Sequence, residues 1–245
     1  MEKLKYVPSG DNGVLIVFGN EINVDINNKI RSFTHLLYME QDYFSEITEL
    51  IPAYTSVLLM YNPLKINYST MINKLKELEK KSGGIILPPP DVVHIPVVYG
   101  GDFGPDLKNV SDHCGLSIEE VITIHSTTNY LIYMIGFTPG FPYLGGMSER
   151  IATPRLKIPR EKILTGSVGI AGNQTGVYPI ESPGGWQIIG RTPLKIFNPE
   201  TEPYVLLKAG QYIKFEPINM NDYLKIEREI EDGLYQVKCT MKGSD

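Results

Sequence analysis

The chain has 245 residues, a length that fits one large domain or two modest ones. Its content of 42% hydrophobic and 21% charged residues is typical of a folded protein and excludes a wholly disordered chain. The formal net charge of -5 argues against nucleic acid or an anionic membrane as a general partner. No apolar run approaches the roughly 20 residues that a membrane-spanning helix needs, and the first residues do not resemble a signal peptide, so we expect a cytoplasmic protein.

The metal-ligating residue types are few and widely spaced. Cys114 and Cys239 are the two cysteines, and they lie far apart in the sequence. No His, Cys or Asp pattern has the spacing of a metal site. We therefore expect two reduced thiols and no metal ion.

The first 88 residues show the periodicities of a small α+β domain. Apolar residues recur at helical spacing over about residues 23–40 and again around Met71–Leu78, which predicts two amphipathic helices. Short apolar runs bounded by turn residues predict the strands, which are Leu4–Val7, Val14–Phe18, two strands within residues 46–61, and Gly84–Leu87. Strands interrupted by two helices indicate a ferredoxin-like fold, with the helices on one face of the sheet.

Three consecutive prolines, Pro88 to Pro90, stiffen the chain and mark the expected boundary between domains 1–88 and 89–245. The second part begins with a strand at His94–Tyr99 and continues with two short helices. Ser117 and Glu120 have the spacing of a capping box at the start of the second helix. From Tyr130 onward, short β-rich runs alternate with Gly and Pro until the extreme C-terminus, which indicates a mainly β barrel or sandwich.

Two motifs in the second part resemble nucleic-acid or nucleotide sites without meeting their requirements. The two short helices have the layout of a helix-turn-helix, but no Lys or Arg occurs between Lys108 and Arg150 to meet phosphates or guanine edges. The glycines of GSVGIAGNQTG lack the Lys and the Ser or Thr that follow the last glycine of a P-loop. We expect a helical hairpin packed on the barrel in the first case and a β-hairpin in the second.

Two Gly/Pro-rich loops and a set of cations are candidates for a binding site. The loops Thr138–Gly146 and Glu181–Pro193 carry aromatic residues, which suit the walls of a ligand or partner site but equally suit turns that cover a barrel core. Arginine side chains between and within these loops could bind a carboxylate or phosphate, and a solvated basic face is the alternative. The cations are Arg150, Arg155, Lys157, Arg160, Lys162, Arg191 and Lys195.

Candidate bases are scarce in the same region. His125 falls on the apolar stripe of its helix, where a histidine is more often a core residue than a base. The acids of the barrel region are widely spaced, and no Asp occurs between Asp112 and Asp222. An anion site with few bases is typical of a shared active site, whose missing groups come from another subunit.

Residues 136–193 resemble a known family. The segments GFTPGFPYLGG, TPRLKIPR and TGSVGIAGNQTGVYPIESPGGWQIIGRTP are similar to those of the bacterial 5-oxoprolinase B-subunit family. That family is also described as Kip-type inhibitors of a sporulation histidine kinase and as allophanate-hydrolase-subunit-one-like proteins. It is similar as well to the carboxyltransferase subdomains C and D of urea carboxylase. The resemblance extends over nearly the whole chain, including IPVVYGGDFGPDL and GLSIEEVITIHS.

The resemblance implies a ferredoxin-like N-terminal domain followed by a cyclophilin-like β-barrel. It also implies an activity, the ATP-driven opening of 5-oxo-L-proline to L-glutamate together with partner subunits A and C. Whether ATP is bound by this chain or mainly by a partner stays open. Inhibition of a histidine kinase is the alternative function. A biotin-dependent carboxyl-transfer module is a third, weaker one, because nothing in the chain resembles a biotin attachment domain.

Candidate roles follow from residue type and from position in these motifs. As catalytic residues we expect Arg155, Arg160 and His125. As substrate-binding residues we expect Gln174, Thr175, Tyr178, Trp186, Arg191 and Phe141. In these roles the arginines stabilise a developing anion and hold the substrate carboxylate, while the polar side chains bond the lactam and Trp186 forms a wall.

Overall fold

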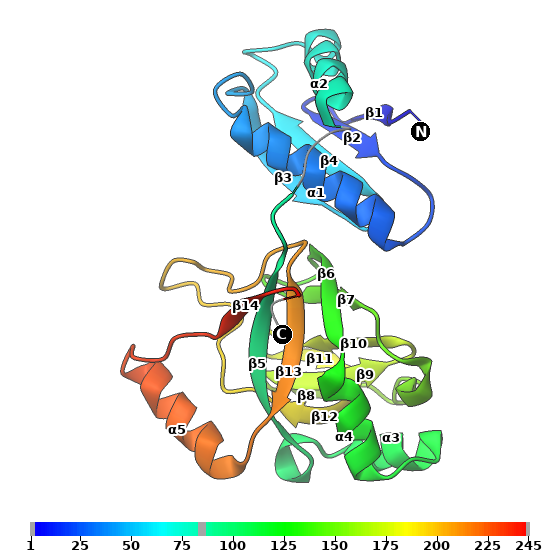
Figure 1. Ribbon diagram of the computed structural model, residues 1–245, viewed down its shortest axis with the longest axis vertical. Coiled ribbons are helices and arrows are strands. Elements are labelled where there is room, and N and C mark those ends of the chain that lie inside the picture. Colours follow the sequence, from blue (N-terminus) through cyan, green and yellow to red (C-terminus); the bar gives the residue numbers. More distant parts are fainter. Residues whose placement is uncertain (1–2, 83–86, 244–245) are drawn as a thin grey trace. The chain divides into compact units, whose positions relative to one another are not determined.

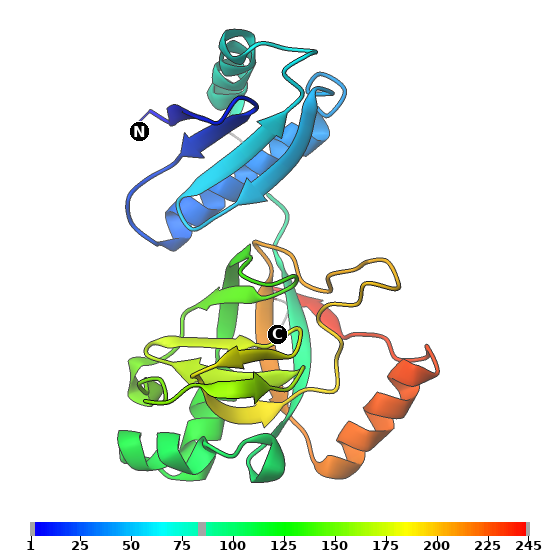
Figure 2. The same ribbon diagram turned by 180° about the vertical axis from the view of Figure 1, so that it is seen from behind.

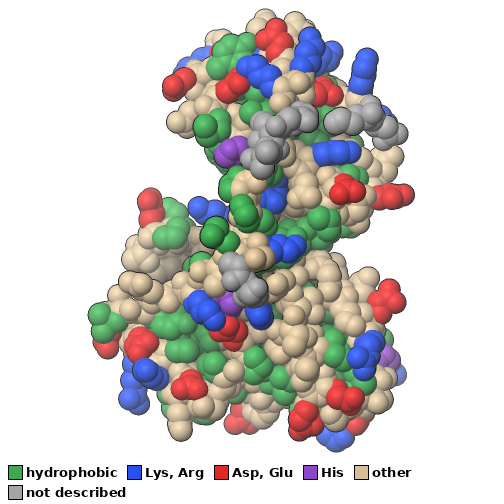
Figure 3. All heavy atoms as spheres, in the orientation of Figure 1, with side chains coloured by type: hydrophobic (Ala, Val, Ile, Leu, Met, Phe, Trp, Pro, Cys, Tyr) green, Lys and Arg blue, Asp and Glu red, His purple; other side chains and the backbone are tan. Residues whose placement is uncertain are grey.

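A computed structural model describes residues 3–82 and 87–243 of the chain. The chain divides into two compact units, Met1–Pro88 and Pro89–Asp245 (Figure 1). None of the described helices combines the length and the apolar character needed to cross a membrane. On the face drawn in Figure 3, acidic and basic side chains of the described residues are interspersed, without a single-sign patch of the kind that nucleic acid requires.

The first unit is an antiparallel sheet covered on one face by two helices (Figures 1 and 2). The sheet order is β1-β2-β4-β3, and the helices are α1 (Val24–Met39) and α2 (Tyr68–Ser82). The strands are β1 (Lys5–Ser9), β2 (Gly13–Val17), β3 (Ile47–Pro52) and β4 (Ser56–Tyr61). The elements follow the expected order of two strands, a helix, two strands and a helix. The expected last strand, Gly84–Leu87, lies outside the described residues except for Leu87, which is not in a strand.

Burial explains why the helices of this unit form where they do. The Asn23 side chain caps α1 by accepting a hydrogen bond of 2.8 Å from the backbone N–H of Ile26. The apolar side chains of α1 that recur at helical spacing are fully or almost fully buried against the sheet. Alternate residues of β2 and β4 are buried, as expected for a sheet with one covered face.

The second unit is built on an eight-stranded sheet that curls into a nearly closed barrel (Figure 2). The sheet order is β10-β9-β12-β5-β13-β6-β7, with β14 paired to the free part of β5. The end strands β7 and β10 lie against each other, which brings the barrel close to closure. The strands are β5 (Asp91–Tyr99), β6 (Asn129–Ile135), β7 (Pro142–Gly145), β9 (Ser167–Ala171), β10 (Gln174–Val177), β12 (Gln187–Arg191), β13 (Tyr212–Pro217) and β14 (Cys239–Met241).

The remaining elements lie on the outside of this sheet. A two-stranded ribbon of β8 (Arg160–Ile163) and β11 (Ser182–Gly184) flanks it, and short 3-10 turns occur at Gly101–Phe103 (η1) and Glu149–Ile151 (η2). The hairpin of α3 (Leu107–Cys114) and α4 (Ile118–Thr127) packs on the barrel, and α5 (Met220–Glu231) precedes the C-terminal segment. The capping box of Ser117 and Glu120 is confirmed. The segment GSVGIAGNQTG forms the β9–β10 hairpin, so the expected β-hairpin is confirmed.

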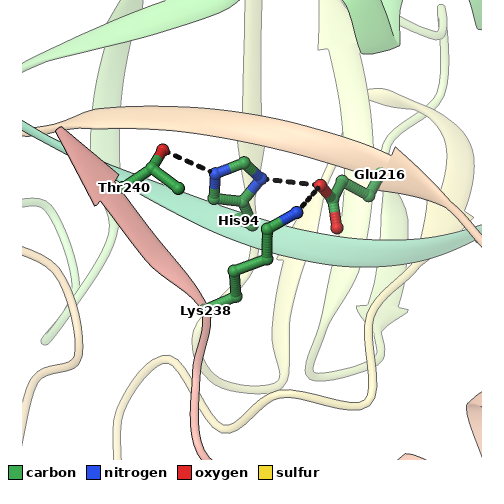
Figure 4. A network of polar contacts seen from close by, with 4 residues as sticks. All are labelled: His94, Glu216, Lys238 and Thr240. Carbon is green, nitrogen blue, oxygen red and sulfur yellow. Dashed lines mark hydrogen bonds and ion pairs between the residues drawn. The ribbon is translucent and has the colours of Figure 1, made fainter. Parts of the chain in front are cut away.

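A buried histidine attaches the C-terminal strand to the barrel. His94 of β5 is 4% exposed, and its ring contacts both neighbouring strands (Figure 4). Nδ1 lies 2.6 Å from Oε1 of Glu216, and Nε2 lies 2.9 Å from Oγ1 of Thr240. Nζ of Lys238 lies 2.9 Å from the same Glu216 oxygen. Because a carboxylate only accepts, Nδ1 carries the proton and donates it to Glu216.

We predict that Glu216→Gln loosens this attachment in a pH-dependent way. Burial raises the pKa of Glu216, but the hydrogen bonds from Lys238 and His94 outweigh it and hold the pKa below its ordinary value. A lowered carboxyl pKa stabilises the fold above the unfolded value of about 4.3, and this contribution is lost as the pH falls through the folded pKa. The urea midpoint of Glu216→Gln should therefore lie below that of the wild type at pH 7, and the two should converge as the pH falls through the folded pKa of Glu216. Glu200→Gln, at an exposed loop position, is the control; an equal midpoint shift in both variants contradicts the prediction.

Candidate functional site

An aromatic cluster lies where the β8–β11 ribbon meets β10 and β12. Three of its rings meet edge to face, with centroid distances of 5.8 Å from Phe141 to Trp186, 5.8 Å from Phe141 to Tyr178 and 6.0 Å from Tyr178 to Trp186. Gly176 of β10 permits this packing, since a Cβ there would lie 3.2 Å from the Trp186 ring. The members of the cluster are Phe141, Tyr143, Ile163, Tyr178, Trp186 and Ile188.

Tyr178 is 4% exposed, and its hydroxyl lies next to Gly184 of β11. A Cβ on Gly184 would lie 2.6 Å from the Tyr178 oxygen, so any other residue there would displace the Tyr178 side chain. Burial raises the pKa of Tyr178 to about 12, although the positive charges of Arg155 and Arg160 act to lower it. The hydroxyl therefore stays protonated at neutral pH and can donate a hydrogen bond.

Arg160 is held by an acid that the sequence interpretation missed. Its Nη2 donates to Oδ1 of Asp106 at 2.7 Å, and its Nη1 donates to the carbonyl of Trp186 at 3.4 Å. The other Asp106 oxygen accepts from the backbone N–H of Ile188 at 2.7 Å, and the Asp106 side chain is 5% exposed. Asp106 lies in the turn GPD before α3. Because it is 54 residues from Arg160 in the sequence, no motif spacing could have predicted the pair. Arg160 is therefore a structural ion-pair partner as well as a cation at the site.

Arg155 is the freer of the two cations beside Tyr178. It lies in the exposed loop before β8, and among the described residues none forms an ion pair with it. The backbone of this loop is fixed, because the Leu156 N–H donates to the carbonyl of Gly185 at 2.7 Å. A Cβ on Gly185 would lie 3.8 Å from the Arg155 Cβ, so the arginine lies beside the glycine that follows β11. This geometry leaves its guanidinium available to an anion.

Of two further predicted residues, Gln174 lies on the strand face next to the aromatic cluster and Arg191 lies away from it. Gln174 is half-buried and points to the same face of β10 as Gly176, because side chains two apart share a face. Arg191 lies elsewhere, with Nε donating to the Thr165 carbonyl at 2.9 Å and its guanidinium 5.5 Å from the ring of Phe103. Arg191 and Arg160 thus lie at opposite ends of the β8 segment, and Arg191 does not join the candidate site.

His125 and Thr175 lie in the core of the barrel, which corrects their expected roles at a substrate site. His125 has no exposed surface, and Thr175 is 1% exposed. The His125 ring stacks on Phe215 at 4.6 Å, and its Nδ1 lies 2.7 Å from the hydroxyl of Tyr99. Its Nε2 lies 2.8 Å from Oγ1 of Thr175. The core interpretation of His125 is therefore the one that this geometry supports.

Counting donors fixes the direction of these bonds. The Thr175 hydroxyl donates its one proton to the carbonyl of Gly169 at 3.0 Å, so it accepts from His125. Nε2 of His125 accordingly carries the proton, and Nδ1 accepts from the Tyr99 hydroxyl. Every polar atom of the ring is satisfied, and burial lowers the pKa of His125 to about 3. The neutral ring connects α4 to the β9–β10 hairpin that carries Gln174.

Comparison with known proteins gives the family. The family described as carboxyltransferase domain, subdomain C and D, matches residues 4–207. The chain is 45% identical over 230 residues to the 5-oxoprolinase B subunit of Bacillus subtilis, covering 90% of this chain and 95% of that protein. This chain belongs to the 5-oxoprolinase B-subunit family. The Haemophilus influenzae protein of the same name is 35% identical, with 86% of this chain and 97% of that protein covered.

Two solved structures are similar to this chain. A protein of Pyrococcus horikoshii, described as conserved and uncharacterized, is 46% identical, with a TM-score of 0.53 and coverage of 89% of this chain and all of that chain. The urea amidolyase of Kluyveromyces lactis is 19% identical with a TM-score of 0.72, covering 97% of this chain and 16% of that one. The second likeness concerns the fold alone.

Within the described residues, no group of three His, Cys, Asp or Glu side chains could hold a metal ion.

We predict that Arg155 and Arg160 differ sharply in their effect on stability. Arg160→Ala leaves the buried Asp106 carboxylate without its cation and should lower the free energy of unfolding by about 1–3 kcal/mol. Arg155→Ala removes an exposed side chain and should change it by less than about 0.5 kcal/mol. Urea unfolding measures both. Adding Asp106→Asn to Arg160→Ala should cost less than the sum of the two single changes, and strict additivity would contradict the ion pair.

We predict that His125 gives the stability of this family member a slope against pH. The unfolded histidine binds a proton below about pH 6.5, whereas folded His125 stays neutral until about pH 3. Its contribution is complete above pH ~6.5 and falls by about 1.4 kcal/mol per unit as the pH decreases. His125→Gln, which keeps a donor toward Thr175, should lack this part of the slope. Urea unfolding at pH 7, 6 and 5 compares the two proteins, and parallel curves would refute the assignment.

Proposed function

We propose that this chain is the B subunit of an ATP-dependent 5-oxoprolinase, which opens 5-oxo-L-proline to L-glutamate together with partner subunits A and C. The main observation behind this proposal is that four side chains lie together on the outside of the barrel, namely Arg155, Arg160, Tyr178 and Trp186. The chain's relatives are also named for this complex. These relatives' names favour the hydrolase-subunit interpretation over inhibition of a histidine kinase.

The chemistry of a lactam suits this constellation. The ring amide is stable, and transfer of the γ-phosphoryl group of ATP to its oxygen makes the ring carbon electrophilic toward water. Arg155 holds the substrate carboxylate or the phosphoryl group, since its guanidinium is a planar fork without an ion-pair partner among the described residues. The protonated Tyr178 hydroxyl donates a hydrogen bond to the developing anion. Trp186 and Phe141 form the walls around the lactam ring.

Among the described residues, the expected acids and bases are not free to act at the site, which supports a shared site. Asp106, the carboxylate beside Arg160, already bonds Arg160 and the Ile188 N–H. His125, the expected base, has no exposed surface. A general base and the ligands of a nucleotide-bound metal ion would then come from partner subunits, and the chain alone would be inactive.

The fold assignment within this proposal has two parts. In the first unit, the order β1-β2-β4-β3 supports a ferredoxin-like fold in which β1 takes the edge position of the usual last strand. In the second unit, the nearly closed barrel flanked by helices supports the cyclophilin-like assignment. That likeness concerns architecture and carries no isomerase activity.

The test is 5-oxoproline-dependent ATP hydrolysis by purified subunits. We expect no turnover by the lone chain and turnover by the three subunits together. In the complex, Arg155→Ala should reduce kcat/KM by about 100-fold or more, and Tyr178→Phe by about 10- to 100-fold, because each removes a donor to developing charge. Arg191→Ala is the matched arginine control and should retain most activity. ATP hydrolysis by the lone chain, or full activity of the complex with Arg155→Ala, would contradict the shared-site proposal.

A further inference from the structure

Phe137 is held in an unfavourable conformation at the surface. Its φ is 67°, and among the residues that the structure describes it is the one non-glycine residue with a positive φ. An aromatic residue rarely adopts this left-handed conformation, because its Cβ meets the following carbonyl. The side chain is nevertheless 76% exposed, and its ring contact is with Phe141 at 6.0 Å. Little of its apolar surface is buried, so packing within the chain does not offset the strain.

Two backbone hydrogen bonds fix this conformation. The Gly136 N–H donates to the Phe141 carbonyl at 3.0 Å, and the Thr138 N–H donates to the Gly136 carbonyl at 2.8 Å. The loop between β6 and β7 is therefore a tight turn that projects Phe137 outward. Strain that persists at an exposed position is a sign of function, because the surrounding structure must impose it.

A second exposed apolar side chain borders the same cluster. Ile158 is 84% exposed and lies in the loop before β8. Pro159 follows it and lies 3.7 Å from the position of a Cβ on Gly185, so this loop runs beside the Trp186 end of the aromatic cluster. Phe137 contacts the Phe141 end of the same cluster. The two exposed side chains therefore flank one patch.

We call this patch the Phe137–Ile158 surface, and its charges have one sign. It consists of Phe137, Arg155, Lys157, Ile158 and the half-buried Trp186. Within the described parts of the chain, neither Arg155 nor Lys157 has a carboxylate partner. The chain as a whole is acidic, with a formal net charge of -5. An apolar centre with aromatic side chains, flanked by unpaired cations, has the composition of a protein–protein hot spot.

We propose that the Phe137–Ile158 surface is the docking face for a sister subunit, which presents an apolar pocket bordered by carboxylates. This inference rests on the proposed function. The carboxylates match Lys157 in charge, which leaves Arg155 to the substrate anion, and they belong to the class of group that the candidate site lacks. Docking here covers the edge of the aromatic cluster, removes water from around Arg155, and brings acidic groups next to the candidate site in one event.

Phe137→Gly is the sharpest variant. Glycine adopts a positive φ without strain, so the lone variant should unfold at the same temperature as the wild type or higher. Loss of the ring should nevertheless weaken assembly with the sister subunits by about 30-fold, the effect of removing a hot-spot side chain. A variant that is as stable alone and assembles poorly separates docking from folding.

The assembly assay is analytical ultracentrifugation or interferometry with the purified full-length sister subunits. Ile158→Asp should weaken assembly at least tenfold, and Lys157→Glu should do so more at low salt than at high salt. Leu234→Asp, at an apolar position 72% exposed beyond α5, is the matched control and should assemble like the wild type.

The outcomes separate this inference from the proposed function. Wild-type affinity of both Phe137→Gly and Ile158→Asp overturns the docking face, as does failure of the wild type to bind either sister subunit. Assembly that depends on the surface, without 5-oxoproline-dependent ATP hydrolysis by the assembled wild-type subunits, supports the docking face and refutes the activity. Equal weakening by Leu234→Asp also overturns the inference, because the effect would then not be specific to the surface.

Discussion

The second unit depends on the pairing of β5 along both of its edges. One edge carries the parallel strand β13 from Val92 to Val97, and the other carries β14 near Val93 and β12 at Val98 and Tyr99. A strand in this position must be apolar on both faces, and residues 92–97 are all buried. His94 is the polar exception, and it is stable there because both ring nitrogens have partners on β13 and β14.

The candidate site is connected to this barrel through buried polar groups. Asp106 joins Arg160 to the backbone of β12, and His125 joins α4 to the β9–β10 hairpin through Thr175. A buried charge or imidazole costs free energy unless its hydrogen bonds are complete, so such groups fix one arrangement of their neighbours. Exposed residues such as Arg155, which lies beside Gly185, then take their positions from the backbone that these buried groups fix.

The sequence was most informative where local chemistry decides the structure. The helix periodicity, the capping box of Ser117 and Glu120, and the β9–β10 hairpin all follow from residue type and spacing, and they are found as expected. Aromatic residues in the two Gly/Pro loops suited either the walls of a site or turns that cover the barrel core, and the sequence left both open. The structure brings Phe141, Tyr178 and Trp186 into mutual contact.

The sequence by itself determined the family, the mixed α/β character of the first unit and the residue types available to the site. Only the tertiary structure decided which of them meet. Arg191 matched Arg160 in type and motif, yet it packs near Phe103, and Thr175 turns its hydroxyl into the core. The physical reason is that strand pairing sets which side chains share a face, and a carboxylate such as Asp106 pairs with whichever cation lies beside it in space. Those contacts join residues 50 or more apart in the chain, and no periodicity records them.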